Sequence, residues 1–129
     1  MKTYSYSITV EESHLDILNH VNNVVYVQWV QDIAQKHWDL AITDQIKLDY
    51  FWVLLNHSID YKKPAVLHDE IEVKTFILKS GGVKSVRCVE FYLKETNTLL
   101  VRSETTWCLF NTKTQKPNRI TEAITNCFN

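Results

Sequence analysis

The chain has 129 residues, the usual length of one domain, so we expect a single domain over residues 1–129. Hydrophobic residues make up 45% and charged residues 22%, which is typical of a globular domain and excludes an intrinsically disordered chain. The net charge of −1 gives no basic excess that would favour nucleic acid or anionic lipid as a partner. The longest apolar run, Tyr50 to Leu55, is too short to cross a bilayer, and the N-terminus lacks a signal-peptide core, so we expect a cytoplasmic protein.

The N-terminal part of the sequence predicts one strand followed by one long helix. Apolar and aromatic residues alternate with polar ones from Tyr4 to Val10, the pattern of a half-buried strand. A later segment without Gly or Pro runs from Asn22-Asn23 to about Ala41. Its apolar face recurs at spacings of three and four: Tyr26, Trp29, Val30, Ile33, His37 and Ala41. This pattern predicts an amphipathic helix, and either Asn22 or Asn23 can cap its first turn.

After a connector near residues 43–49, the sequence predicts β-structure. Alternating runs indicate strands at 51–61, 70–78, 83–93 and 99–110, joined by short turns, with a short terminal helix at 121–127. One helix cannot bury its apolar face alone, so the order predicts an α+β domain in which a curved antiparallel sheet wraps around one long central helix. The unpaired edges of such a sheet predict a homodimer or homotetramer.

The three cysteines, Cys88, Cys108 and Cys127, are widely spaced and form no C-x-x-C pair. The sequence therefore predicts neither a zinc knuckle nor a redox pair. Two of the cysteines fall within predicted strands, where a free thiol packs as a small apolar group. We expect all three to be structural thiols.

The densest polar segment, residues 14–23, lies between the first strand and the start of the helix. The first turn of a helix has backbone N–H groups without partners and a partial positive charge, which can polarise a carbonyl or stabilise an oxyanion. Asp16 in this segment can act as a general base or as a carboxylate nucleophile. The alternative is that Asp16 and the asparagines only cap the helix and turn the loop.

At this segment the sequence resembles the hot-dog-fold thioesterases of the 4-hydroxybenzoyl-CoA thioesterase-like family, which includes bacterial acyl-CoA and plant-type acyl-ACP thioesterases. The residues that carry the resemblance are His14-Leu15-Asp16, His20-Val21-Asn22-Asn23 and Tyr26. Residues 59–65 with His68-Asp69, and then residues 82–85, are similar to the family's later Pro, Gly-Asp and G-x-x-S motifs, and they follow in the same order. The resemblance implies a hot-dog fold and thioester hydrolysis without a cofactor or a metal.

The resemblance also implies roles for particular residues. Asp16 matches the family's catalytic carboxylate, and the backbone N–H that polarises the thioester carbonyl falls at about Asn23. His20 can orient Asp16 or a water, or it can be a loop residue that bonds only to backbone. Asn19 stands where many members have Gly, and Leu18 stands where the acyl-ACP enzymes have Asn. His14 matches the H-x-D form that resembles the long-chain acyl-CoA branch. These departures weaken the acyl-ACP assignment more than the assignment to thioesterases.

Four further residues are candidates for substrate binding, each with a structural alternative. Tyr26 can line an acyl tunnel beside the helix or belong to the core. Ser85 can face the site across a subunit interface or be a hairpin residue without a role. Lys62 and Lys63 can meet the phosphates of CoA or form a solvated pair at a strand end.

We therefore predict an acyl-CoA thioesterase, with the acyl chain in an apolar channel beside the helix and the CoA along the surface. The alternatives are an acyl-ACP thioesterase and a non-catalytic protein that binds acyl thioesters. A hydratase of the MaoC type fits less well, because its D-x-N-P-x-H motif separates Asp and His by five positions, whereas Asp16 and His20 are four apart with no Pro between them. A metal site made by His14, Asp16 and His20 has no supporting ligand cluster in the sequence, so we expect none.

Overall fold

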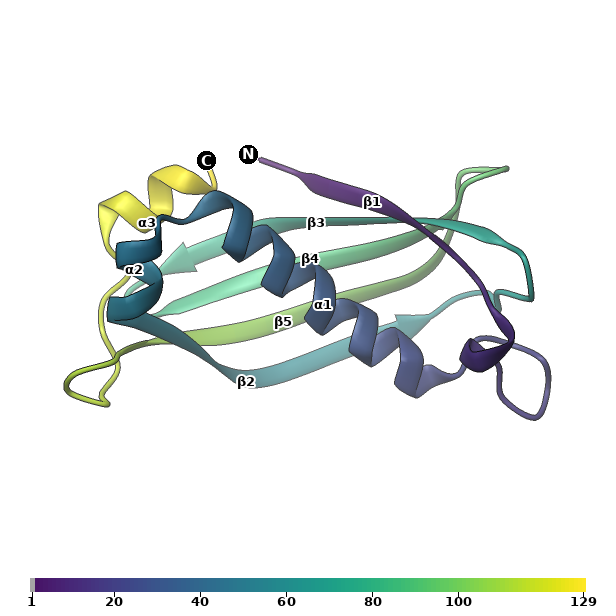
Figure 1. Cartoon of the computed structure of the whole chain (residues 1–129), viewed down its shortest axis with the longest axis horizontal. Helices are drawn as coiled ribbons and strands as arrows, with labels where there is room; N and C mark the ends of the chain where they lie inside the picture. The colour runs from purple at the N-terminus through teal and green to yellow at the C-terminus, as the bar shows by residue number, and fades with distance from the viewer. Residues whose placement is uncertain (1) are drawn as a thin grey trace.

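One five-stranded antiparallel sheet and the 19-residue helix that crosses it, α1 (Asn23–Ala41), dominate the computed structural model, which describes residues 2–129 (Figure 1). The strand order β1-β3-β4-β5-β2 leaves β1 and β2 at the two edges. The strands are β1 (Tyr4–Thr9), β2 (Tyr50–Tyr61), β3 (Glu70–Gly81), β4 (Lys84–Leu93) and β5 (Thr98–Asn111). The shorter helices are the 3-10 helix η1 (Glu12–His14), α2 (Asp44–Asp49) and α3 (Glu122–Cys127).

Helix α1 begins where the sequence places a capping residue. The side-chain oxygen of Asn22 accepts the backbone N–H of Val24 at 2.9 Å, which satisfies one of the free donors of the first turn. The buried face of α1 keeps the spacing of three and four that the sequence predicts: Tyr26, Trp29, Val30, Ile33, Ala34 and His37. The predicted curved sheet around one central helix is therefore confirmed.

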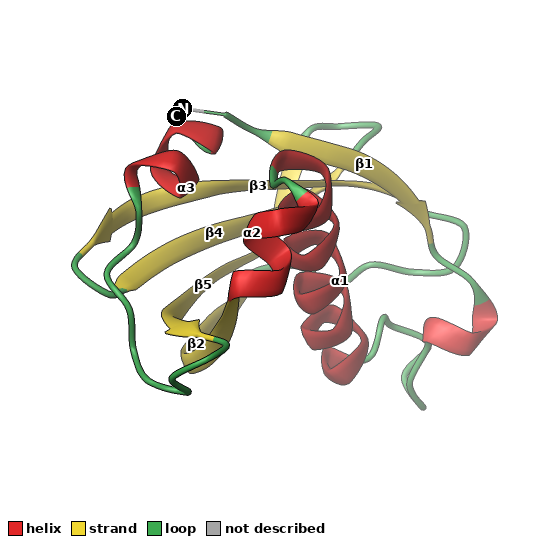
Figure 2. Ribbon diagram, turned by 60° about the vertical axis from the view of Figure 1, so that its left-hand side comes forward, coloured by secondary structure: helices red, strands yellow, loops and turns green. Residues whose placement is uncertain are grey.

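The core has two parts, one at each end of α1. The first surrounds the N-terminal half of α1, where Trp29, Val30 and Ile33 pack on Val73 and Phe91 of the sheet. The second lies at the C-terminal end of α1, where helices α2 and α3 gather beside it (Figure 2). Its buried side chains are Ile42, Leu109, Ile124 and Phe128. The chain termini meet at this same end, since the backbone N–H of Lys2 donates to the carbonyl of Phe128 at 3.3 Å.

The structure differs from the sequence expectation at residues 44–49, which form α2 rather than an irregular connector. Thr43 caps this helix by accepting the N–H of Ile46, and Ile46 packs against the second core cluster. A helix of six residues is too short for a period of 3.6 residues to be recognised in sequence. The buried positions of Cys88 and Cys108 within strands agree with structural thiols. No helix within residues 2–129 has both the length and the apolarity needed to span a membrane.

Candidate active site

Asp16 lies at the start of a tight turn that leads into α1. One carboxylate oxygen, Oδ1, accepts the backbone N–H groups of Leu18 (2.9 Å) and His20 (3.2 Å). The backbone N–H of Asp16 in turn donates to the carbonyl of His20 at 2.8 Å, which closes the turn. The other oxygen, Oδ2, has no hydrogen-bond partner among residues 2–129. The carboxylate is therefore held in place through one oxygen while the second remains available.

Two residues near this turn adopt the left-handed conformation that favours glycine. They are Asn19 (φ 62°) in the turn itself and His68 (φ 73°) in the loop before β3. Both stand where the resembling family has Gly, so the two departures in sequence coincide with the two backbone positions that Gly fits best. Asn tolerates this conformation better than most residues, because its short polar side chain can bond locally.

The first turn of α1, seven residues after Asp16, supplies a free backbone donor. Asn22 uses its side chain to satisfy Val24, and its carbonyl accepts the N–H of Val25 at 2.9 Å. The backbone N–H of Asn23 has no acceptor within the described chain, so it is free to bond a ligand. Its carbonyl accepts the hydroxyl of Tyr61 at 3.4 Å, which ties the end of β2 to the start of the helix.

The loop after β2 runs alongside this turn and brings two lysines to the same end of the molecule. The backbone N–H of Val21 donates to the carbonyl of Ala65 at 2.9 Å, and His20 forms an isolated bridge with Val66. Lys62 and Lys63 are exposed at the start of this loop. The loop that carries the two lysines is thus tied to the segment after Asp16, and a shared binding site of these residues stays a prediction.

His20 and Tyr26 lie close to Asp16 along the chain but in different settings. The contacts of His20 with Asp16 run through its backbone, and its imidazole makes no hydrogen bond to any of residues 2–129. Tyr26 is 2% exposed, with its ring edge-on to Trp29 and Phe91. Burial raises the pKa of the Tyr26 hydroxyl, which lies in the core without a partner in the described chain. The structure places Tyr26 in the core, and its contact with substrate stays a prediction.

Ser85 lies at the opposite end of the sheet from Asp16. It is buried at the start of β4 and lines a cavity of about 340 Å³, which we call the aromatic pocket. The walls of the aromatic pocket include Trp38, Phe51, Trp52, Trp107 and Phe128. Within one chain, the structure therefore does not bring Ser85 to the Asp16 turn.

Two polar residues of this region were not candidates from the sequence: Arg87, which lines the aromatic pocket, and His37 on α1. Arg87 is 6% exposed and donates to the imidazole of His37 at 2.8 Å. The only sequence signal is position, because Arg87 alternates in phase with Val89 and Phe91, whose side chains face the helix. An arginine in phase with the buried residues of a strand is unusual, and this position is the signal in the sequence that marks Arg87 as a candidate.

Residues 1–128 match the family described as acyl-ACP thioesterase N-terminal domain. The chain belongs to this family. It is also 26% identical, over 114 residues and 84% of both chains, to the long-chain acyl-CoA thioesterase FadM of Escherichia coli K12. The predicted membership of the hot-dog thioesterases is confirmed, and with it the prediction that the chain is a thioester hydrolase.

Solved structures show the same fold at low sequence identity. A 1,4-dihydroxy-2-naphthoyl-CoA thioesterase from Synechocystis superposes with a TM-score of 0.84 at 18% identity, covering 98% of this chain and 96% of that one. A Staphylococcus aureus protein in complex with CoA gives 0.85 at 16% identity, covering 98% and 81%. The 12:0-ACP thioesterase of Umbellularia californica gives 0.85 at 17% identity, covering 98% of this chain and 51% of that one. These likenesses confirm the hot-dog fold and assign no residue a role.

Proposed function

We propose that the chain hydrolyses acyl-CoA thioesters at the turn formed by Asp16 and the first residues of α1. One observation carries the proposal: a carboxylate oxygen and a helix N-terminal N–H, both without partners in residues 2–129, lie on one short loop. Acyl transfer needs these two groups, a base or nucleophile and a donor for the developing oxyanion. The turn that holds Asp16 keeps its carboxylate oriented without using its second oxygen.

In the proposed reaction, the thioester carbonyl accepts the N–H of Asn23, which stabilises the negative charge that develops on its oxygen. Oδ2 of Asp16 then takes a proton from an attacking water, and the C–S bond breaks to release the acid and the CoA thiol. In the second route, Oδ2 attacks the carbonyl itself, and water hydrolyses the resulting mixed anhydride. Both routes need no cofactor, because the thioester is already activated and the task is placement of base and water. His20 has its imidazole free to orient the water.

CoA is the proposed carrier, although the family is described by its acyl-ACP members. FadM, an acyl-CoA enzyme, is similar over most of both chains, and one structural relative is a complex with CoA. Lys62 and Lys63 are exposed beside the turn, where flexible ammonium groups can meet CoA phosphates as point charges. An acyl-ACP substrate and binding without hydrolysis are the two alternatives. Cytoplasmic CoA pools suit a chain whose three cysteines are free.

We also propose that two copies of the chain form a homodimer through the edge strand β2. β2 is an edge strand that carries the exposed side chains of Leu54 and Leu55, and an open edge pairs readily with another strand. Antiparallel pairing of two β2 strands places the end at Tyr61 beside the beginning, at Tyr50, of the second copy. The Tyr61 end contacts Asn23, and Tyr50 borders the aromatic pocket. Such a dimer brings the pocket and Ser85 of one copy to the Asp16 turn of the other.

The test is release of free thiol from acyl-CoAs with short, long and aromatic acyl groups, measured with and without EDTA. We expect release from at least one class, unchanged by EDTA. No release from any class would contradict the enzyme and leave the binding protein. Loss of activity with EDTA would contradict metal-free hydrolysis. Light scattering should give a dimer or tetramer, and a 15.2 kDa monomer at micromolar concentration would contradict the shared site.

A further inference from the structure

The aromatic pocket contains a buried positive charge that no acidic residue offsets. Nη1 of Arg87 donates to Nδ1 of His37 (2.8 Å) and to Oγ1 of Thr75 (3.0 Å), which are both neutral acceptors. Nε and Nη2 of Arg87 make no hydrogen bond to residues 2–129. No carboxylate in this part of the chain lies within 4.0 Å of the guanidinium. One edge of the guanidinium is therefore without a partner.

The surroundings of Arg87 confirm that it is a cation beside neutral groups. Burial lowers the pKa of Arg87 only to about 10, so the guanidinium stays protonated at neutral pH. Burial and then the charge of Arg87 lower the pKa of His37 to about 4, so this imidazole is neutral and can accept the hydrogen bond. The ring of Phe128 lies 5.8 Å from Cζ of Arg87 and gives a cation–π contact, but no negative charge. A buried charge without a counter-charge is costly, on the order of several kcal/mol.

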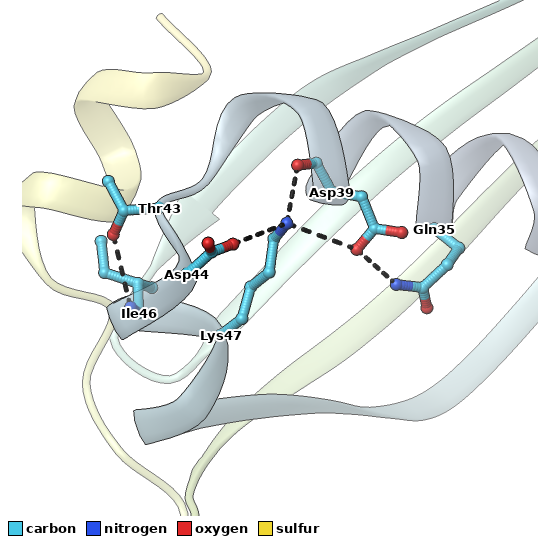
Figure 3. A network of polar contacts seen from close by, with 6 residues as sticks. All are labelled: Gln35, Asp39, Thr43, Asp44, Ile46 and Lys47. Atoms are coloured by element: carbon cyan, nitrogen blue, oxygen red, sulfur yellow. Dashed lines mark hydrogen bonds and ion pairs between the residues drawn. The ribbon is translucent and has the colours of Figure 1, made fainter.

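The acidic residue at the rim of the pocket is already engaged. Asp39 accepts the amide of Gln35 at 3.0 Å and lies 4.0 Å from Nζ of Lys47 (Figure 3). Lys47 also pairs with Asp44 at 3.8 Å. Among the side chains that line the pocket, Arg87 is thus a cation without a counter-charge, and the carboxylate of Asp39 already has partners.

We infer that the aromatic pocket binds the far end of an acyl group that carries a carboxylate, paired with the free edge of Arg87. This inference rests on the proposed function and names its substrate class, an ω-carboxyacyl thioester. The two N–H groups on one edge of a guanidinium match the two oxygens of a carboxylate. The aromatic walls bind the apolar part of the acyl group, and a cavity of about 340 Å³ accommodates a group of this kind.

The dimer supplies the path from the pocket to the thioester. His37, which contacts Arg87, lies fourteen residues after Asn23 on α1, which corresponds to about 21 Å. Val30 and Ile33 are fully buried between them, so close-packed core separates the pocket from the Asp16 turn of the same chain. The pocket is bordered instead by the first residues of β2, next to the edge that pairs in the proposed dimer. The carboxylate therefore sits in one copy while the thioester is cleaved at the other.

The experiment compares ω-carboxyacyl-CoAs with unsubstituted acyl-CoAs of equal chain length, from short to long. At its best length the wild type should have a kcat/KM at least about tenfold higher for the carboxylated substrate, the scale of one charge-assisted bond. Arg87→Met should remove this preference, so that the ratio of the kcat/KM values for the carboxylated and unsubstituted substrates falls to about one. Arg102→Met is the matched control, because Arg102 lies on the neighbouring strand β5, pairs with Glu90 and Glu104, and does not line the pocket. It should keep the preference.

A second measurement does not depend on catalysis. Free α,ω-dicarboxylates and the matching monocarboxylates are titrated into the wild-type protein by calorimetry, with tryptophan fluorescence as a second signal because Trp38, Trp52 and Trp107 line the pocket. Tighter binding of the dicarboxylates in the wild type, lost in Arg87→Met or weakened in Arg87→Lys, supports the inference even if no thioester is cleaved. Hydrolysis with no preference for a carboxylate, together with no dicarboxylate binding, overturns the inference and leaves the proposed function standing. If Arg87→Met does not fold, the wild-type preference and the Arg87→Lys variant decide.

Discussion

The two ends of α1 hold their charges in opposite ways. At the N-terminal end, backbone N–H groups of Leu18 and His20 surround one oxygen of Asp16, so the negative charge is stabilised by a turn built from adjacent residues. At the C-terminal end, Arg87 is buried against neutral His37 and Thr75, and its positive charge has no acidic partner in residues 2–129. The charge at the first end is thus stabilised within one loop, whereas the charge at the second end has no partner of opposite charge among the side chains around it.

Asp16→Asn, at the N-terminal end of α1, should have the largest effect on activity. The amide oxygen of Asn can accept the same two backbone N–H groups, so the turn and the melting temperature should change little. Loss of the charge on Oδ2 should lower kcat by about 10²-fold or more, the usual scale of a general base. Steady-state kinetics on the best acyl-CoA and thermal unfolding measure the two effects separately.

Asp69→Asn is the matched control for this variant. Asp69 also accepts a backbone N–H, that of Val66 at 2.9 Å, in the loop that runs beside the Asp16 turn. The same change of charge there should alter kcat only a few-fold. Near wild-type turnover in Asp16→Asn would remove Asp16 from the mechanism. An equal loss of kcat in Asp16→Asn and Asp69→Asn would show that any negative charge in this region supports the reaction, without a specific role for Asp16.

The residues of the N-terminal end could be predicted from the sequence because they lie close together along the chain. Asp16, His20, Asn22 and Asn23 lie within eight positions, so their chemistry and spacing are visible before folding. Asn22 caps α1 as expected, and the positive φ of Asn19 explains a position where the resembling family has Gly. The general order of strands and helix followed from apolar periodicity, because each element has one buried face.

The other end could not be predicted in the same way, because its residues come from distant elements. His37, Thr75 and Arg87 belong to α1, β3 and β4, and Phe128 directly follows α3, so only the packing of the helices on the sheet brings them together. Ser85 was predicted as a site residue, yet the structure places it in the pocket at this end rather than near Asp16. Whether it acts across the dimer stays a prediction, since only the pairing of β2 with a second copy would bring it to the turn.

His37→Asn tests the second end through the dependence of stability on pH. The folded pKa of His37 is about 4, below its ordinary 6.5, because of burial and the charges of Arg87 and Lys2. A lowered folded pKa means that the unfolded chain binds the proton more readily, so stability is lost as pH falls from 6.5 towards 4. For the wild type this loss should be on the order of 2–3 kcal/mol, and Asn, which does not titrate, should remove that part of it.

Chemical denaturation between neutral pH and pH 4 gives the free energy of unfolding of both proteins. The difference in this free energy between wild type and His37→Asn should become smaller as the pH falls. His57→Asn is the comparison, because burial is the one cause that lowers the pKa of His57, with no contribution from a charge among residues 2–129, and its imidazole bonds to Ser103. The change in slope should be smaller there. Parallel curves for wild type and His37→Asn would show that folding leaves the pKa of His37 unchanged, which would contradict a buried neutral imidazole held against the charge of Arg87.

Asn22→Ala should have smaller effects, and it should lower both stability and activity because Asn22 caps the start of α1. Loss of the cap on the N–H of Val24 should cost about 1 kcal/mol of unfolding free energy. Because the first turn of α1 also carries the N–H of Asn23, kcat/KM should fall along with stability. Thr43→Ala removes the corresponding cap of α2 at the other end, where Thr43 accepts from Ile46, and should cost similar stability with kcat unchanged. Equal kinetic effects of the two variants would mean that the helix start has no special role.

The smallest expected effects come from restoring glycine at the two left-handed positions near the Asp16 turn. A residue with a Cβ in this conformation is strained by roughly 1 kcal/mol, and Asn is strained less than other residues. Gly relieves the strain but adds conformational entropy to the unfolded chain, worth about 0.5–1 kcal/mol. The relieved strain and the added entropy nearly cancel for Asn19→Gly, so its stability should be nearly unchanged. His68→Gly relieves more strain and should be neutral or stabilise the fold by about a few tenths of a kcal/mol. Both should keep wild-type kcat, since only the backbone at φ 62° and 73° shapes the turn. A tenfold loss of kcat in Asn19→Gly alone would instead place the Asn19 side chain in the site and extend the reacting loop beyond Asp16, His20 and Asn23.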